Sequence, residues 1–273
     1  MTHGMTTSGP GGGGRLREVF ISAVQYDEQL RSGAKTVLDL APLAASFGVQ
    51  GVEFRDMYWR EKDSELPQVR RQLAQHKLKA VYATRTPLYH PDPAMQRKLI
   101  EDIEDARGLG AMLLRVNVGQ RPGAGPADAR THYAGRMGVE RAAALRVHLT
   151  LENNSRPPDH LLSEIRETLG SFSCRFLGTT IDFANYVTTG QDPLEAIPAL
   201  ARWINYVHVK DARKIAEGWQ STYLGDGNLP LNAIVAALDA TGKPIPLCFE
   251  FPGDGDPDGR IQKSLEWLAT LEG

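Results

Sequence analysis

Short runs of apolar and β-branched residues alternate with longer amphipathic segments along nearly the whole chain. Strand-like runs that alternate with helix-length segments are typical of repeated βα units and a parallel sheet. Eight runs qualify as strands, and they cover residues 19–25, 51–55, 79–85, 112–118, 147–153, 176–182, 205–211 and 245–251. With helices between the strands and after the last one, this pattern predicts an α/β fold, the (β/α)8 TIM barrel.

The alternative is a doubly wound open sheet that binds a nucleotide. Such a sheet carries a glycine-rich GxGxxG turn after its first strand, whereas the only glycine-rich stretch here precedes the first strand. The barrel is therefore favoured. We expect the first helix from about 34 to 47, with Gly48 as its C-terminal cap. Residues 214–230 are expected to form a long loop on the C-terminal face of the barrel, where active sites of such barrels are built.

Length and charge limit the domain count and the partners. A chain of 273 residues fits one barrel domain, which we place over residues 15–273 behind a flexible tail of residues 1–14. The formal charge of −2 argues against nucleic acid or an anionic membrane as a partner. The two cysteines, Cys174 and Cys248, form no metal or disulfide motif, and no apolar leader or span is present, so we expect a cytoplasmic protein. No surface pattern demands a homo-oligomer, although barrels of this kind often pair through their helices.

Polar side chains mark the ends of four consecutive strands. In the fifth strand, Glu152 alternates with Leu149 and Leu151, so it points into the barrel when the leucines pack outward. The same alternation turns inward the side chains that end the next three strands, which are Asp182, His208 and Glu250. Taken singly, an inward glutamate or histidine is more often a structural residue than a functional one. Four on neighbouring strands indicate a shared site.

Three converging carboxylates repel one another unless a cation lies among them. Oxygen ligands with one imidazole and no sulfur suit a divalent ion of the Mn²⁺, Mg²⁺, Co²⁺ or Zn²⁺ type. The sequence therefore predicts one divalent metal ion as cofactor. A small-molecule substrate would bind beside it.

Further polar residues near the barrel mouth are candidates for substrate binding. Lys210 and Arg213 follow the histidine and suit a carboxylate or phosphate, or else a salt bridge at the rim. Arg115 is either the ion-pair partner of Glu53 or Glu152, or an anchor for an acidic substrate. Glu53 and Arg55 point inward together, and we expect them to pair. The full set of substrate-binding candidates is Arg115, Asn154, Asn185, Lys210 and Arg213.

The motifs "GVEFR", "LTLENN", "IDFAN", "YVHVKD", "LGDG" and "CFEF" stand in an order and spacing that resemble the xylose isomerase-like TIM-barrel superfamily of sugar phosphate isomerases and epimerases. The resemblance covers nearly all of residues 17–273. It implies that Glu152, Asp182, His208 and Glu250 are the metal ligands. In the family's isomerases and epimerases, the metal stabilises an enediolate and two glutamates move the proton. This implies that Glu152 and Glu250 are catalytic.

The sequence departs from many of the epimerases at two points. Asn185 stands where they place a histidine, and "SRPP" at 155–158 stands where they carry a further glutamate. The resemblance therefore leaves the contacts to the far hydroxyl groups of a sugar open.

We hypothesise a divalent-metal-dependent isomerase or epimerase that acts on a small sugar or sugar phosphate. An alternative is a 3-dehydroshikimate dehydratase-type lyase, because Arg115 and Lys210 resemble residues of such a site and would suit a cyclic acid. An endonuclease IV-like nuclease is disfavoured, because it uses several metals and more histidines than these strand ends supply. A non-catalytic barrel is disfavoured by the intact set of ligands.

Overall fold

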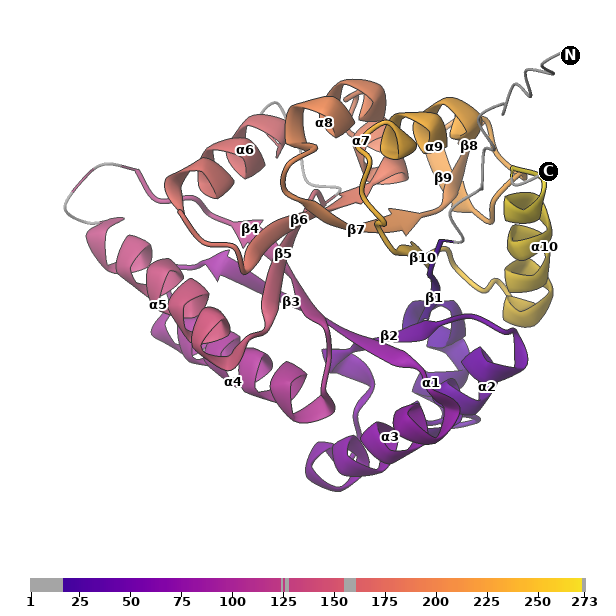
Figure 1. Cartoon of the computed structure of the whole chain (residues 1–273), viewed down its shortest axis with the longest axis horizontal. Coiled ribbons are helices and arrows are strands. Elements are labelled where there is room, and N and C mark those ends of the chain that lie inside the picture. Colours follow the sequence, from indigo (N-terminus) through magenta and orange to yellow (C-terminus); the bar gives the residue numbers. More distant parts are fainter. Residues whose placement is uncertain (1–16, 124, 126–127, 155–160, 272–273) are drawn as a thin grey trace, which may run out of the picture.

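The barrel is seen in a computed structural model that describes residues 17–123, 125, 128–154 and 161–271. Eight parallel strands close on themselves in the order β1-β10-β7-β6-β5-β4-β3-β2, with helices around them (Figure 1). The (β/α)8 fold predicted from the sequence is confirmed. The tail predicted over residues 1–14 and the stretch 155–158 lie outside the described residues. The barrel strands are β1 (Val19–Ser22), β2 (Gly51–Arg55), β3 (Lys79–Tyr89), β4 (Leu113–Gly119), β5 (His148–Glu152), β6 (Leu177–Asp182), β7 (Ile204–Val209) and β10 (Leu247–Phe249).

Helices and short 3-10 turns connect these strands. They are η1 (Ala23–Tyr26), α1 (Asp27–Ser32), η2 (Val37–Asp39), α2 (Leu40–Ser46), η3 (Asp56–Tyr58), α3 (Lys62–His76), α4 (Pro93–Leu109), α5 (Ala129–Leu145), α6 (Leu161–Ser171), α7 (Phe183–Thr188), α8 (Pro193–Leu200), α9 (Leu231–Asp239) and α10 (Pro257–Ala269). None of the helices in the described part of the chain has both the length and the apolar character needed to cross a membrane.

The first helix differs from its prediction. Instead of one helix over 34–47, a 3-10 turn over Val37–Asp39 leads into a short α2, and an unpredicted helix α1 precedes both. The reason is local capping. Gly33 ends α1 in the left-handed conformation at φ 87°, and Thr36 with Asp39 forms a capping box that starts the next turn. Gly48 follows α2 with φ +71°, in keeping with its predicted place at the helix end.

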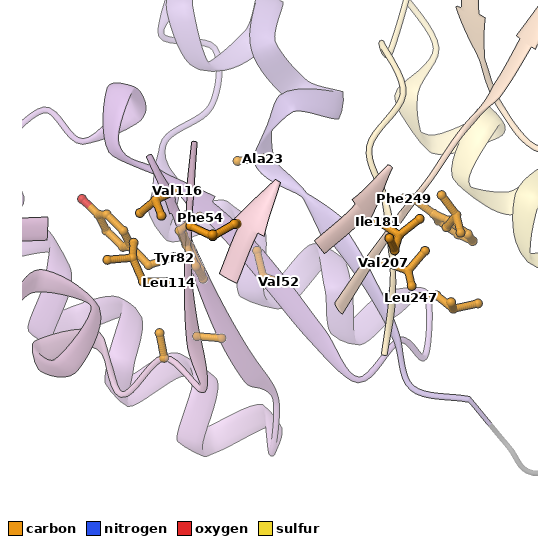
Figure 2. Close-up of a cluster of buried hydrophobic side chains, with 14 of the residues drawn as sticks. Ala23, Val52, Phe54, Tyr82, Leu114, Val116, Ile181, Val207, Leu247 and Phe249 are labelled. Carbon is orange, nitrogen blue, oxygen red and sulfur yellow. The ribbon is translucent and has the colours of Figure 1, made fainter. Parts of the chain in front are cut away.

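The main core lies between the barrel and its helices. Apolar residues at every second strand position point outward and bury themselves against the helices, among them Val52, Phe54, Ile181, Val207 and Phe249 (Figure 2). This alternation follows from the two-residue period of a strand. Its consequence is that the residues between them, including Glu53 and His208, face the inside of the barrel.

Inside the barrel, an apolar floor lies beneath the polar strand ends. Phe20, Val81, Leu113, Tyr206 and Cys248 form a separate buried cluster, and the rings of Phe20 and Tyr206 meet edge-to-face with centroids 6.0 Å apart. Each floor residue precedes the next inward residue of its strand by two positions, as Tyr206 precedes His208. The inner side chains of the barrel thus form stacked layers, and the polar layer lies above an apolar one.

The prediction of a loop over residues 214–230 was wrong for the first half of that segment. The chain there forms an antiparallel hairpin of β8 (Asp211–Ile215) and β9 (Gly218–Thr222), in which Ile215 pairs with Gly218 across a two-residue turn. Gly218 has a φ of +131°, a conformation that glycine adopts without steric cost. Ser221 on β9 lines the cavity at the barrel mouth, so the segment still reaches the face on which it was expected.

Replacing Gly51 with alanine should destabilise the barrel. A Cβ at this position of β2 would lie 2.2 Å from Phe20 Cε1 and 2.7 Å from the Lys79 carbonyl oxygen. The Phe20 ring and the β3 backbone at Lys79 cannot both move aside to make room for the methyl group. We therefore expect Gly51→Ala to lower the free energy of unfolding by about 1–3 kcal/mol. Urea unfolding followed by circular dichroism measures this value.

The matched control is Gly170→Ala in α6, where a new Cβ would meet nothing within 4 Å. There we expect a gain of about 0.5–1 kcal/mol, since alanine loses less backbone entropy than glycine in a helix. Equal effects at the two positions would show that the β2 contact is not tight.

Candidate metal centre

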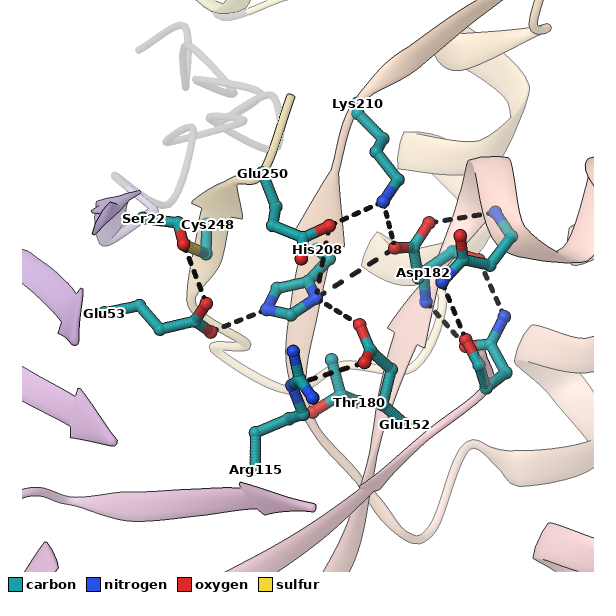
Figure 3. A network of polar contacts seen from close by, with 12 residues as sticks. Ser22, Glu53, Arg115, Glu152, Thr180, Asp182, His208, Lys210, Cys248 and Glu250 are labelled. Carbon is teal, nitrogen blue, oxygen red and sulfur yellow. Dashed lines mark hydrogen bonds and ion pairs between the residues drawn. The ribbon is translucent and has the colours of Figure 1, made fainter. Parts of the chain in front are cut away.

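The ends of four neighbouring strands bring together the four residues predicted as metal ligands. Glu152 on β5, Asp182 on β6, His208 on β7 and Glu250 after β10 each offer one ligand atom, and these atoms lie within 4.8 Å of one another (Figure 3). His208 and Asp182 are fully buried, and the side chain of Glu250 is 12% exposed. The strand order makes these residues neighbours, because β10, β7, β6 and β5 are adjacent in the barrel.

His208 lies at the centre of this cluster. Its Nδ1 is 2.5 Å from Glu152 Oε1, 3.9 Å from Glu250 Oε2 and 4.0 Å from Asp182 Oδ2. Its other ring nitrogen, Nε2, is 2.6 Å from Glu53 Oε2. Nδ1 is therefore the nitrogen that faces the carboxylates, and Glu53 orients the ring from the opposite side. A carboxylate behind the histidine is the usual arrangement at metal sites.

Glu53 has a role that sequence reasoning missed. Its pairing with Arg55 is present, with Arg55 Nε 3.0 Å from Glu53 Oε1, and the Ser22 hydroxyl donates to the same oxygen at 2.9 Å. The contact with His208 was not predicted, because β2 and β7 are not neighbours in the sheet and meet only across the barrel interior. The inward position of Glu53 in "GVEFR" was the one signal that could have indicated it.

Four cations balance the four buried carboxylates. Lys210 Nζ lies 2.8 Å from Asp182 Oδ2 and 2.5 Å from Glu250 Oε2, and Arg55 forms a short ion pair with Glu250. Arg115 Nε lies 3.2 Å from Glu152 Oε2, while another of its nitrogens donates to the Thr84 carbonyl. Arg115 is thus the ion-pair partner of Glu152, one of the two roles considered for it. The fourth cation is His208 in its protonated form.

This charge arrangement shifts the pKa values of the cluster. Burial by itself would lower the pKa of His208, but the attraction of Glu53, Glu250 and Glu152 outweighs it and raises that pKa to about 10. Burial and the repulsion of Glu250 and Glu152 raise the pKa of Asp182 to about 6, although Lys210 opposes the shift. Burial would also raise the pKa of Glu250, yet Lys210, His208 and Arg55 bring it well below its usual value.

Two asparagines hold Asp182 in place. The side chain of Asn153 accepts from the Asp182 N–H at 2.8 Å and donates to the Asp182 carbonyl at 2.9 Å. Asp182 also caps α7, because its Oδ1 accepts from the Asn185 N–H at 3.0 Å. The Asn185 amide donates to the Asn153 carbonyl at 2.9 Å, so this candidate substrate residue serves to support the ligand loop. Only Oδ2 of Asp182 is left to face the cluster.

The remaining two candidates are Arg213 and Asn154. Arg213 is on the hairpin strand β8, where it pairs with Asp226 at 2.5 Å, and it does not line the cavity at the mouth. Arg213 thus forms a salt bridge, which was the alternative to substrate binding. Asn154 lies two residues after the end of β5 and is half-buried.

A cavity of about 520 Å³ opens above the cluster. It reaches the cluster at Arg55, Lys210 and Glu250, and its other walls include Gln25, Tyr58, Arg85 and the loop of residues 251–255. This volume lies within the range of small-molecule sites.

The donor set fits a divalent cation. Asp182 Oδ2 is buried, and its one recorded contact among the described cations besides His208 is the ion pair with Lys210 Nζ. His208 Nδ1 faces three carboxylates. Three carboxylates with one imidazole suit Mn²⁺, Mg²⁺, Co²⁺ or Zn²⁺. A second group, Glu53, His208 and Cys248, also lies within 4.8 Å. There, burial raises the pKa of the Cys248 thiol well above its usual value, so the thiolate that a metal needs is disfavoured.

The closed parallel barrel carries a cluster of three carboxylates and one histidine at the ends of four adjacent strands. The chain belongs to the xylose isomerase-like TIM barrel family, whose model matches residues 41–271. The resemblance seen in the sequence is thereby confirmed. Among curated proteins, it is 28% identical over 102 residues to the uncharacterized protein YihM of Escherichia coli (strain K12). That match spans 36% of this chain and 30% of YihM.

Solved structures share the fold over nearly the whole chain. A D-psicose 3-epimerase with D-tagatose from Clostridium cellulolyticum H10 has a TM-score of 0.76 at 13% identity, covering 93% of this chain and 99% of that one. A D-allulose 3-epimerase from Methylomonas sp. with D-allulose has a TM-score of 0.73 at 18% identity, covering 93% and 97%. The probable 3-DHS dehydratase AsbF from Bacillus anthracis has a TM-score of 0.71 at 18% identity, covering 92% and 98%.

Metal binding should release a proton from His208. With its pKa raised to about 10, the imidazole is protonated at pH 7–8 in the metal-free protein, whereas a metal needs Nδ1 unprotonated. We therefore expect about one proton to leave per Mn²⁺ bound, and the affinity to rise about tenfold per pH unit over this range. Titration calorimetry in buffers of different ionisation enthalpy counts the protons. An affinity independent of pH between 7 and 8.5 would show that His208 is neutral before metal binds.

Replacing Glu53 with glutamine should weaken metal binding without removing a ligand. The amide can still accept from His208 Nε2, but the charge that orients and polarises the ring is lost. We expect a loss of about 10–100-fold in Mn²⁺ affinity, measured by calorimetry. Glu28→Gln is the matched control, because Glu28 is an exposed carboxylate on the wall of the same cavity. Equal losses in the two variants would mean that Glu53 acts only through overall charge.

Proposed function

We propose that this chain is a divalent-metal-dependent isomerase or epimerase that acts on a small sugar or sugar phosphate. The observation that carries the proposal is the pair Glu152 and Glu250. They come from opposite ends of the ligand set, on β5 and just after β10, and both face His208 Nδ1. Such a pair can take a proton from one face of a carbon and return it to the other. Structural neighbours that are sugar epimerases support this choice.

The cluster residues have the charge states that proton transfer requires. Opposing cations lower the pKa of both Glu152 and Glu250 in spite of their burial, so both are ionised and ready to accept a proton. Glu250 lines the cavity and is the carboxylate that a substrate reaches first. Glu152 lies deeper and is held by Arg115. A divalent ion held by the four ligands would polarise a substrate carbonyl and acidify the neighbouring C–H bond.

Lys210 supplies a positive charge at the edge of the cavity. Burial opposes its protonated form, but Asp182 and Glu250 raise its pKa above the ordinary value, so its ammonium group persists. It holds Asp182 and Glu250 together and borders the cavity. In the proposed reaction it donates a hydrogen bond to a substrate oxygen that gains negative charge.

A second candidate is a lyase of the 3-dehydroshikimate dehydratase type, which is favoured by Arg85. This exposed guanidinium lines the cavity and forms no hydrogen bond or ion pair among the described residues, although Asp27 on the same wall is within its electrostatic reach. An acidic substrate would supply an anion that the guanidinium can contact directly. Arg115, which the sequence offered for this purpose, is instead paired with Glu152.

The proposal is tested by hydrogen exchange into a ketose. Mn²⁺-loaded protein should exchange the proton next to the carbonyl of D-allulose with D₂O, followed by ¹H NMR. Glu250→Gln and Glu152→Gln should each lower this rate by about 10²–10⁴-fold, because each removes an acid–base group. Glu28→Gln should retain the wild-type rate. In parallel, 3-dehydroshikimate is assayed through the ultraviolet absorbance of its aromatic dehydration product.

The exchange assay and the dehydration assay together distinguish the two candidate functions. Exchange without dehydration supports the epimerase, and dehydration without exchange supports the lyase. If metal-loaded wild-type protein does neither with D-allulose, its phosphate or 3-dehydroshikimate, both proposals are wrong.

A further inference from the structure

Four cationic side chains line the cavity above the cluster, and three of them are already paired. Arg55 and Lys210 are bound to carboxylates of the cluster, and Arg31 Nε lies 2.7 Å from Asp27 Oδ1. The fourth is Arg85, which is exposed and whose guanidinium group forms no hydrogen bond or ion pair within the described part of the chain. This group is therefore available to a ligand in the cavity.

The neighbours of Arg85 on β3 show in which direction its side chain points. The hydroxyl oxygens of Thr84 and Thr86 lie 3.0 and 2.6 Å from Oδ2 of Asp102 on α4, and they are 2.9 Å from each other. Both threonines therefore face outward, toward the helices. Because side chains alternate across a strand, Arg85 between them points to the other side, into the barrel mouth.

A local irregularity in β3 fixes the backbone that carries Arg85. The register of β3 with β4 shifts between Ala83 and Pro87. On the inner side of this segment, Arg115 Nη1 donates to the Thr84 carbonyl oxygen at 2.9 Å. Bulge-like irregularities are common at the rims of barrels and next to active sites, where they re-aim a side chain. Arg85 is thus carried by a segment that is held by the strand beside it.

Asp102 is a buried charge that holds the same segment from behind. It is fully buried on α4, and its Oδ1 forms a short ion pair with Lys98 while its Oδ2 meets the two threonines. The Thr84 hydroxyl also lies 3.1 Å from Asp56 Oδ2 at the start of η3, so the network joins two parts of the cavity wall. A buried carboxylate destabilises a fold unless it is compensated. Here the compensating contacts fix the position of the β3 end.

The surroundings of Arg85 are not uniformly positive. Burial would raise the pKa of Asp27, but hydrogen bonds to its carboxylate and the charges of two arginines, one of them Arg85, lower it. The guanidinium group is thus directed toward α1, although it is not paired with Asp27. Glu28 on the same wall is exposed and also forms no ion pair with any described residue. An anion at Arg85 would therefore be held by direct contact with the N–H groups of the guanidinium, and not by an overall positive field.

We propose that Arg85 is a specificity-determining residue that binds an anionic group of the substrate, a carboxylate or a phosphate, and that Asp102 is the positioning residue that holds Arg85 in place. This inference rests on the proposed function and narrows the substrate from sugars in general to those that carry a negative charge. The planar guanidinium matches both kinds of oxyanion with paired N–H donors. The anion would lie on the β3 side of the cavity, while the reacting carbon would lie at Glu250.

The test compares D-allulose with D-allulose 6-phosphate in Mn²⁺-loaded protein, because the two ketoses differ only in the anion. In Arg85→Gln, we expect KM for hydrogen exchange of the phosphate ester to rise about 10–100-fold with kcat nearly unchanged, since a charge-assisted contact away from the reacting carbon is lost. Exchange of D-allulose should keep its wild-type KM. The carboxylate is tested with 3-dehydroshikimate, as a substrate or as an inhibitor of D-allulose exchange.

Arg71→Gln is the matched control, because Arg71 is an exposed guanidinium on α3 that does not line the cavity. It should leave all three compounds unaffected. A loss in Arg85→Gln that is confined to the phosphate ester identifies a phosphate as the anion, one confined to 3-dehydroshikimate identifies a carboxylate, and losses with both show a site that accepts either. If Arg85→Gln weakens neither anion more than Arg71→Gln does, the inference is wrong.

The role of Asp102 is tested through Thr86, so that the buried carboxylate itself is kept. Thr86→Val removes one hydroxyl contact to Asp102, while Thr84 and Lys98 still hold it. We expect KM for D-allulose 6-phosphate to rise about three- to tenfold without a change for D-allulose, and Thr86→Ser to restore the wild-type value. Because the effect acts through Arg85, Thr86→Val should add nothing to Arg85→Gln in the double variant. An unchanged KM in Thr86→Val, or additive effects, would show that Asp102 does not position Arg85.

A binding measurement separates this inference from the proposed reaction. Calorimetry gives the Kd of D-allulose 6-phosphate and of 3-dehydroshikimate for the Mn²⁺-loaded wild type, Arg85→Gln and Arg71→Gln. If the wild type exchanges no ketose but binds one of these anions about tenfold more tightly than Arg85→Gln does, the proposed reaction is wrong and the anion site stands. If the wild type binds neither anion more tightly than Arg85→Gln, the anion site is wrong even where D-allulose is exchanged.

Discussion

The structure depends on the neutralisation of four carboxylates in the mouth of one barrel. Glu53, Glu152, Asp182 and Glu250 are almost entirely buried, and uncompensated charges in such a place are strongly destabilising. Arg55, Arg115, Lys210 and protonated His208 supply an equal number of positive charges. A divalent ion that replaced the His208 proton would add positive charge where three carboxylates already meet.

The barrel tolerates this concentration of charge because its inner side chains are arranged in layers. The floor of Phe20, Tyr206 and their neighbours is apolar and dry, and the ring of Tyr206 packs edge-on to His208 with centroids 5.5 Å apart. Two residues further along the strands, the layer becomes polar and opens into the cavity. Asp182 and Glu250 then stand between solvent-accessible space and an apolar base. This arrangement lets ionised groups lie close to a substrate while the fold beneath them is held by apolar packing.

The low sequence identity to the structural neighbours is consistent with this separation between apolar packing and a polar site. Chains that share 13–18% of their residues with this one superpose over more than nine-tenths of its length. The outward positions need only be apolar and of suitable size to pack against helices. The fold by itself does not fix the substrate, so substrate choice is to be sought in residues of the cavity wall such as Arg85.

The sequence by itself determined the barrel and the inward direction of the candidate ligands. Eight apolar runs with a two-residue period specify which residues of each strand face inward, and this local rule holds for Glu152, His208 and Glu250 alike. It predicted the Glu53–Arg55 pair for the same reason. Local patterns failed where the outcome depends on capping and turns, as in the short first helices and in the hairpin of Asp211–Thr222.

Only the tertiary structure decided which charged group meets which across the barrel. Glu53 and His208 are 155 residues apart and lie on strands that are not neighbours, so no strand pattern relates them. The position of Gln25 on the cavity wall and the engagement of Arg213 with Asp226 were likewise set by long-range closure. The physical reason is that periodicity determines the face on which a side chain lies, whereas closure of the barrel determines the atoms it meets there.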